Sequence, residues 1–337
     1  MSAATIKDVA REAKVSVASV SRAMNGGSGV TEQTRQRIQE AAERLRYVPH
    51  AAARMLITRR TRTIGALLPD LYGEFFSELI RGIDLAARAQ DLHLLVASYR
   101  GHPEELCAAL RTMRGRVDGL LVMSPYVSTP VEVAADLASL PVILVNTQTL
   151  APGIGAICID NYGGAVTMVE HLVAMGHQQI AFIAGPEDNF DAHERRRGYR
   201  EAMRRLLPEV TEWILPGDFD EASGHRAGLA LLASTQRPDA VFAANDMMAL
   251  GCLFALAQGG LTIPADIALA GFDDIPLARY VHPSLTTMRT NIADVGGRAV
   301  AMLVSRVSNE AAPVKERVVL TTELIVRESS AAKPAHF

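Results

Sequence analysis

Residues 5–25 read TIKDVAREAKVSVASVSRAMN, and this stretch decides the fold of the N-terminal region. Apolar residues recur at helical spacing over 5–13, behind Thr5, which is a good helix-capping residue. After a short break, Ser16 can cap a second helix that runs to about Met24. Two short helices separated by a tight turn are typical of a helix-turn-helix module.

The second helix carries an outward face that is unusual for a solvated helix. Its outward positions are Val17, Ala18, Ser21, Arg22 and Asn25. Small apolar residues beside an arginine suit a helix that contacts thymine methyl groups and a guanine edge in the major groove of DNA. A third helix over about 32–46, capped by Thr31, completes the module.

The charge of the chain is divided unevenly. The 337 residues have a formal net charge of −3, which taken alone argues against a nucleic-acid partner. Residues 1–62 hold 12 Lys and Arg against five Asp and Glu, a net of +7, whereas residues 63–337 hold 22 against 32, a net of −10. A basic head on an acidic body is expected of a nucleic-acid-binding module joined to a part with another task.

The stretch at 5–25 resembles the N-terminal signature of the lactose-repressor/galactose-repressor (LacI/GalR) family, and YVPHAAARML at 47–56 resembles the family's hinge segment. The resemblance implies two hinge helices that pair across a dimer and enter the minor groove, where Leu56 would wedge between base pairs. A plain core leucine of the linker is the alternative. The expected roles are base readout by Val17, Ala18 and Arg22, phosphate contacts by Ser16, Ser21, Asn25 and Tyr47, and minor-groove insertion by Leu56.

From residue 63 onward, apolar runs of strand length alternate with helical patterns, and the arrangement restarts after about residue 160. This alternation predicts two α/β lobes, each with a parallel sheet between helices, and a C-terminal part that crosses back to complete them. Together with the family resemblance, which implies the hinge helix and a likeness to periplasmic binding proteins, the expected fold is an all-α helix-turn-helix head and hinge helix joined to a two-lobed, doubly wound, periplasmic-binding-protein-like effector domain. The expected domains are 1–48, a hinge and linker at 49–62, and 63–337.

Two-lobed α/β folds bind small molecules between the lobes, at the carboxyl ends of the strands. The side chains expected there are Asp70, Phe75, Asn146, Asp191, Arg195, Phe219, Asn245 and Asp273. Aromatic faces with amide, carboxylate and guanidinium groups suit a sugar or sugar derivative, and a purine could use a similar set. The chain departs from many family members at Gly73-Glu74 and Asn146-Thr147, so the identity of the effector stays open.

No motif of an enzyme, metal site or cofactor site is found in the sequence. Cys107, Cys158 and Cys252 form no CxxC pair, and the nucleophile elbow, phosphate-binding loop and zinc-protease motifs are missing. No apolar run is long enough to span a bilayer, and the N-terminal stretch lacks the apolar core of a signal peptide, so a cytoplasmic protein is expected.

The sequence therefore predicts a transcriptional regulator, a repressor by expectation, that binds a pseudo-palindromic operator in double-stranded DNA. It is expected to act as a homodimer, with a tetramer left open, and to be controlled allosterically by a small ligand between the lobes. Whether that ligand releases or promotes DNA binding is not encoded in any motif. The alternative is a cytoplasmic small-molecule sensor whose basic head serves a protein partner.

Overall fold

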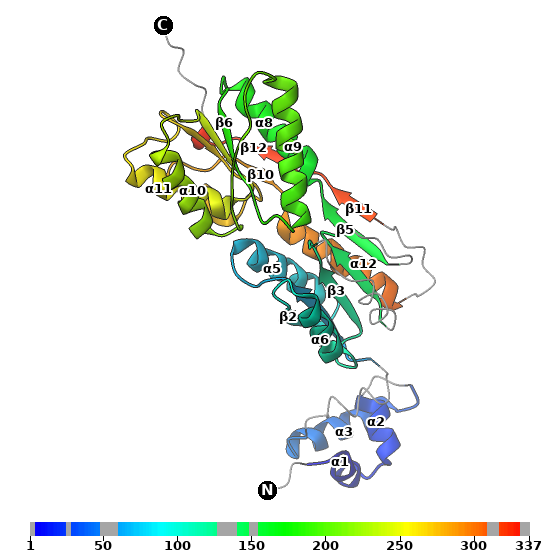
Figure 1. The fold of residues 1–337 in the computed structure, drawn as a ribbon. Helices are drawn as coiled ribbons and strands as arrows, with labels where there is room; N and C mark the ends of the chain where they lie inside the picture. The colour runs from blue at the N-terminus through cyan, green and yellow to red at the C-terminus, as the bar shows by residue number, and fades with distance from the viewer. Residues whose placement is uncertain are drawn as a thin grey trace. The chain divides into compact units, whose positions relative to one another are not determined.

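The computed structural model describes residues 4–24, 28–47, 60–126, 140–147, 154–308 and 317–330. The chain divides into two compact units, Met1–Thr61 and Arg62–Phe337 (Figure 1). We call them the head and the effector unit, and each is treated on its own. Among the described residues, no helix has the length and apolar character needed to cross a membrane.

The head is built from three helices around a small apolar core. The helices are α1 (Ile6–Glu12), α2 (Val17–Met24) and α3 (Glu32–Arg44). Val9, Val20 and Ile38 contribute one fully buried side chain from each helix, so every helix turns an apolar face to the core. The Asp8 carboxylate accepts hydrogen bonds from the backbone N–H and the hydroxyl of Thr5, so the first turn of α1 is capped as expected.

The first lobe of the effector unit contains a six-stranded parallel sheet with the order β11-β5-β4-β3-β1-β2. The strands are β1 (Thr63–Leu68), β2 (His93–Ser98), β3 (Gly119–Met123), β4 (Val142–Val145), β5 (Gly155–Ile159) and β11 (Arg317–Leu320). Helices α5 (Glu74–Arg88) and α12 (Ile292–Ser308) pack on one face, and α6 (Pro103–Met113) packs on the other. Both faces of β1, β3, β4 and β5 are therefore covered, which explains their uninterrupted apolar sequence.

The second lobe contains a four-stranded parallel sheet with the order β7-β6-β8-β9. Its strands are β6 (Ile180–Ile183), β7 (Trp213–Leu215), β8 (Ala240–Ala243) and β9 (Ala268–Ala270). Its helices are α8 (Asn161–Ala174), α9 (Phe190–Leu206), α10 (Glu221–Ala233) and α11 (Asp246–Gln258). Helices α10 and α11 touch backbone to backbone, because a Cβ on Gly224 would lie 2.0 Å from the carbonyl oxygen of Met248.

The C-terminal part of the chain crosses back between the lobes, as the sequence predicts. Helix α12 packs against α5 in the first lobe, β11 joins the first sheet beside β5, and β12 (Glu323–Ile325) pairs with β10 (Thr287–Arg289). Gly82 permits the close approach of α5 and α12, since a Cβ there would lie 2.1 Å from the carbonyl oxygen of Ala293. The chain thus passes between the two lobes more than once. Such connecting segments can act as a hinge between lobes that enclose a ligand.

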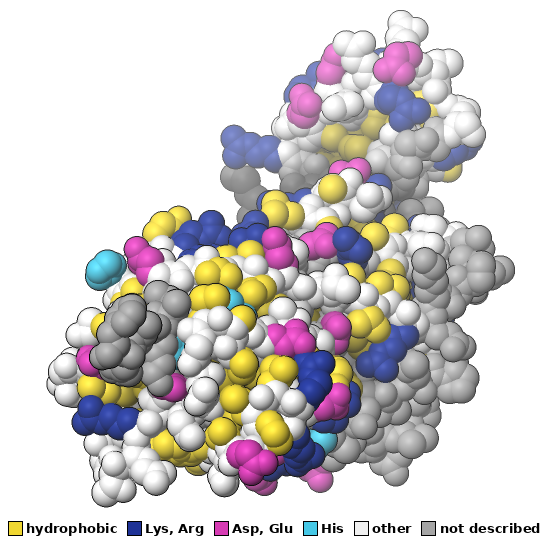
Figure 2. All heavy atoms as spheres, turned by 90° about the horizontal axis from the view of Figure 1, so that it is seen from above, with side chains coloured by type: hydrophobic (Ala, Val, Ile, Leu, Met, Phe, Trp, Pro, Cys, Tyr) yellow, Lys and Arg dark blue, Asp and Glu magenta, His cyan; other side chains and the backbone are white. Residues whose placement is uncertain are grey.

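The outer surface mixes charges of both signs. In Figure 2, acidic and basic side chains are interspersed with hydrophobic ones over the face that is turned toward the viewer. Several exposed charges of the effector unit form ion pairs within a helix, such as Arg81 with Glu78 and Arg298 with Asp294. Such exposed pairs contribute little to stability, typically below about 1 kcal/mol.

Candidate functional site

The outward face of α2 lies exposed on the head, where the sequence places the DNA contacts. Val17 is 41% exposed, and Ser16, Ala18 and Arg22 are also exposed, whereas Ser21 is half-buried. The Ser16 hydroxyl oxygen accepts a hydrogen bond from the backbone N–H of Ser19 at 3.1 Å, so this residue begins α2. An exposed valine at a helix start has no packing role in the head, so the surface is available to a partner.

Three further residues complete the expected DNA-binding set. Tyr47 follows α3 and packs, half-buried, against the apolar core of the head. Asn25 and Leu56 lie outside the described residues, as does the whole expected hinge segment at 49–56. The minor-groove role of Leu56 therefore stays a prediction.

A cavity of about 240 Å³ lies between the two lobes of the effector unit. Seven of the eight side chains expected to bind the effector line it, namely Asp70, Phe75, Asp191, Arg195, Phe219, Asn245 and Asp273. They follow or precede strands of both sheets, so the structure brings together residues that are up to about two hundred positions apart in the chain.

Three residues at or near the cavity have an uncommon backbone conformation. Asn146, Phe219 and Asp273 have φ values of 48°, 67° and 115°, in the left-handed region that residues with a side chain rarely adopt. Each follows a strand, directly or within four residues, and the left-handed turn redirects the chain at the sheet edge. Backbone conformations of this kind cluster at functional sites, because the surrounding structure must hold them in place.

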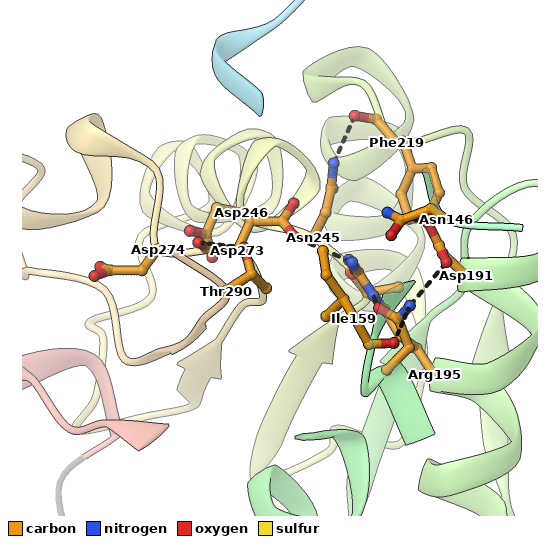
Figure 3. Close-up of polar contacts among 12 residues, drawn as sticks. Asn146, Ile159, Asp191, Arg195, Phe219, Asn245, Asp246, Asp273, Asp274 and Thr290 are labelled. Atoms are coloured by element: carbon orange, nitrogen blue, oxygen red, sulfur yellow. Dashed lines mark hydrogen bonds and ion pairs between the residues drawn. The ribbon is translucent and has the colours of Figure 1, made fainter. Parts of the chain in front are cut away.

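Arg195 is the centre of a buried polar network (Figure 3). The side chain projects from α9 and is only 4% exposed. Its Nε donates to the Oδ1 of Asn161 at 2.8 Å, its Nη1 to the carbonyl oxygen of Ala244 at 2.5 Å, and its Nη2 to the Oδ1 of Asp273 at 3.0 Å. The guanidinium also lies 3.8 Å from the ring centroid of Phe272. Arg195 is therefore held rigidly at the floor of the cavity.

Asn146 reaches this network without lining the cavity. Its Nδ2 donates to the Oδ2 of Asp191 at 2.9 Å, and Asn161 donates to the Oδ1 of Asp191 at 2.8 Å. The Oδ1 of Asn146 has no hydrogen-bond partner among the described residues, although the side chain is buried. Asn146 comes from the first lobe and Asp191 from the second, so this hydrogen bond joins the lobes beneath the cavity.

Burial sets the protonation of the acids in this network. Burial raises the pKa of Asp191 to about 6, and the nearby Arg195 and the two asparagines only partly oppose the shift. Burial also raises the pKa of Asp273 to about 6, against the opposing effect of its ion pair with Arg195. The pKa of Asp246 is raised well above the usual range by burial and by the neighbouring Asp273. Acids that titrate near neutral pH in a cavity are typical of functional sites.

Asn245 lines the cavity and also holds two neighbouring segments of backbone in place. Its Oδ1 accepts from the backbone N–H of Met248 at 3.0 Å and caps α11, and its Nδ2 donates to the carbonyl oxygen of Phe219 at 2.8 Å. These two hydrogen bonds fix the loop that presents the Phe219 ring to the cavity. The side chain keeps one N–H for a ligand.

Comparison with known proteins gives the family. Residues 5–50 match the profile of "Bacterial regulatory proteins, lacI family", and residues 169–330 match a periplasmic binding protein-like domain. The chain is 33% identical over 335 residues to the transcriptional repressor CytR of Escherichia coli K12, with 98% of each chain covered. It is 36% identical over 312 residues to the transcriptional repressor PurR of Aliivibrio fischeri, with 91% of this chain and 93% of the relative covered.

The chain belongs to the lacI family of bacterial regulatory proteins. Among solved structures, a Lac repressor dimer bound to operator and the anti-inducer ONPF superimposes with a TM-score of 0.89 at 29% identity, covering 98% of this chain and 100% of that one. The complex of the regulator CelR with cellobiose is 31% identical with a TM-score of 0.72, covering 97% of this chain and 99% of that one. The expected fold and family are thereby confirmed.

The sequence did not single out several residues that line the cavity of this lacI-family chain. They are Tyr72, Met123, Tyr126, Asp218, Asp220 and Met247. Tyr126 follows β3 and Asp218 follows β7, so the rule that ligands meet the carboxyl ends of strands would have found both. Tyr72 sits two residues after Asp70 in the same loop, whereas nothing in the sequence distinguishes Met247 from an ordinary core methionine.

Proposed function

We propose that this chain is a transcriptional repressor that binds a pseudo-palindromic operator in double-stranded DNA and is controlled by a small molecule in the cavity between the lobes. The observation that carries the proposal is the exposed face of α2 on a head of net charge +7, in a chain whose second unit encloses a cavity. Val17, Ala18 and Arg22 would read bases, and Ser16, Ser21, Asn25 and Tyr47 would position the head on phosphates. Since its proposed target is operator DNA, we place its action in the cytoplasm.

Operator recognition requires two heads. One recognition helix reads too few bases for useful specificity, and a two-fold dimer reads two half-sites. We expect analytical ultracentrifugation at micromolar concentration to find a dimer or tetramer. A monomer with and without operator DNA would contradict this part of the proposal.

The expected hinge segment extends the operator contact into the minor groove. Leu56 would insert between base pairs and bend the DNA, as the family resemblance implies. We expect Leu56→Ala to reduce the bend angle in a gel phasing assay. An unchanged bend would assign this leucine to packing within the linker.

The effector is proposed to be a sugar or sugar derivative, with a purine as the alternative. Aromatic rings at Phe75 and Phe219 can stack on the C–H faces of a sugar, and the carboxylates of Asp191 and Asp273 can accept from its hydroxyls. The solved relatives include complexes with cellobiose and with ribose. A thermal-shift screen of sugars, sugar acids and purines tests this, because a ligand at 100 times its Kd adds about 2.7 kcal/mol of stability.

The chain is proposed to bind its effector without converting it. No step of the proposed mechanism requires bond making, a metal or a cofactor, since control arises from different affinities of the ligand for two conformations of the effector unit. A ligand recovered unchanged after prolonged incubation with the protein is the expected result. Formation of product would favour an enzyme with a DNA-binding head.

A small-molecule sensor whose basic head contacts a protein is the second candidate. Salt dependence separates the two, because a DNA-binding protein releases counterions from each phosphate it contacts. With about 6–10 phosphate contacts, operator affinity should fall by about 10³–10⁵ between 50 and 200 mM salt. A head that serves a protein partner would show no specific operator complex at either salt concentration.

A further inference from the structure

Carboxylates dominate the charge of the cavity wall. The described residues that line it include five acids, namely Asp70, Asp191, Asp218, Asp220 and Asp273. Arg195 is the one basic side chain among the described lining residues. The outer surface differs, since Figure 2 shows charges of both signs interspersed there. The charged groups of the cavity wall are thus predominantly acidic, whereas the outer surface in Figure 2 carries both signs.

Arg195 cannot offset these acids for a ligand. Three of its N–H groups are held by Asn161, Ala244 and Asp273, and its charge is balanced first by the Oδ1 of Asp273 at 3.0 Å. The remaining N–H groups can orient a neutral oxygen of a ligand. A bound anion would instead face Asp191 in the same low-dielectric pocket, where repulsion between like charges is screened least.

The acidic character extends to the mouth of the cavity. Asp220 caps α10, Glu221 follows it, and the Tyr72 hydroxyl of the first lobe donates to the Oε2 of Glu221 at 3.2 Å. Glu221 raises the pKa of Tyr72, and the pKa of Tyr126 is raised by burial first and then by Asp188 and other acids. Arg226 pairs with Asp218 at 3.0 Å, but both side chains are 63% exposed, so water screens this pair strongly.

The remaining wall is aromatic, with rings from both lobes. Those rings belong to Tyr72, Phe75, Phe76, Tyr126 and Phe219. The faces of aromatic rings carry partial negative charge and attract cations. Aromatic faces and carboxylates therefore favour the same ligands. Those ligands are neutral or positively charged and donate hydrogen bonds.

We infer that the cavity excludes anions, and that the effector is an uncharged or positively charged molecule that presents hydroxyl or amino donors. Phosphorylated sugars, sugar acids and nucleotides are excluded, whereas neutral sugars, amino sugars and nucleosides or bases are accepted. The inference deepens the proposed function by narrowing the class of effector. The preference for cations over anions is a property of the cavity, so it can be measured before the effector is identified.

Thiol labelling of the full chain measures this selectivity directly. A cysteine is placed in the cavity by Phe75→Cys, with Tyr126→Cys as a second position, and is labelled at pH 8 with a cationic and an anionic methanethiosulfonate. Ala89→Cys, exposed at the other end of the same helix, is the matched control, and the parent chain corrects for Cys107, Cys158 and Cys252. The ratio of cationic to anionic labelling rates should exceed the control ratio by about tenfold or more.

A ratio equal to or below that of the control at both positions would overturn the inference. Combining each cavity cysteine with Asp218→Asn and Asp220→Asn should move the ratio toward the control, and asparagine preserves the helix cap at position 220. If the ratio of cationic to anionic labelling rates does not change, the charge selectivity does not come from Asp218 and Asp220. Operator binding and its salt dependence are measured on the same proteins, so a failure of the proposed function would be seen separately from a failure of charge selection.

Discussion

The two units of this chain bind their partners by opposite physical means. The head presents an exposed arginine and small apolar groups from a single helix, with Ser16 to Arg22 contiguous in sequence. The effector unit instead buries charge, and its Arg195 and Asp273 side chains are 4% and 5% exposed. Exposed charge gives binding that is fast, salt-sensitive and tolerant of single substitutions, whereas a buried network gives selectivity that depends on every member. The predictions below test this difference.

The largest effect is expected from Arg195→Ala. The substitution leaves Asp191 and Asp273 buried without the opposing guanidinium, and removal of one partner of a buried ion pair typically costs about 3–5 kcal/mol. Urea unfolding of the full chain, followed in the effector unit through the single Trp213, measures the loss. The head has its own core, so operator binding below the melting temperature should be retained.

Arg197→Ala is the matched control for this experiment. Arg197 lies two residues further along α9, is 49% exposed, pairs with Glu194 and stacks over the ring of Tyr162 at 3.9 Å. Its removal should cost less than about 1 kcal/mol. Equal losses in the two variants would show that the Arg195 network is no more important to stability than a surface ion pair.

A smaller effect is expected from Asp191→Asn, and it should depend on pH. Burial raises the folded-state pKa of Asp191 from 3.8 to about 6. The folded state therefore holds this proton more tightly than the unfolded state does, and the stability of the parent falls as the pH rises from about 4 to 6. Above pH 6 the loss is complete. The variant lacks this ionisation. Its stability relative to the parent should therefore improve on the order of 2 kcal/mol between pH 4.5 and 7.5. A stability difference that is constant over this range would mean that Asp191 is ionised throughout.

A loss of similar size, but in operator binding and not in stability, is expected from Arg22→Ala on the head. Loss of one bidentate contact with a guanine should cost roughly 1–3 kcal/mol and relax specificity at one symmetric position of the operator. Titration of operator variants measures both quantities, and Arg44→Ala, on the exposed surface of α3, is the control. A uniform loss over all operator variants would assign Arg22 to phosphate contact instead.

The head and the effector unit also differ in how far the sequence predicts them. The helices of the head follow from local signals, since Thr5, Ser16 and Thr31 mark helix starts and the apolar positions repeat at helical spacing. The strand order of the first sheet could not be obtained in this way. Strand β11 lies beside β5 although about 157 residues separate them, and only long-range packing decides that pairing.

The candidate site shows the same limit. The positions of the predicted strand ends identify Asp70, Asn245 and Asp273 as cavity residues, because parallel strands bring their carboxyl ends together at one edge of the sheet. No motif indicates that Asn146 contacts Asp191 from the other lobe, or that the Arg195 guanidinium has three hydrogen-bond partners. Such contacts depend on how the lobes meet, and no local pattern encodes that.

The link between the two units is the central claim, and an operator titration with and without a ligand tests it most directly. The ligand is a neutral sugar, amino sugar or nucleoside that stabilises the effector unit in the thermal-shift screen. Ligand and operator binding should be coupled by about 1–3 kcal/mol, so the Kd for operator should change by about 5- to 150-fold at saturation. Arg195→Met should abolish the ligand-dependent change. An operator Kd that is identical with and without saturating ligand would contradict the account.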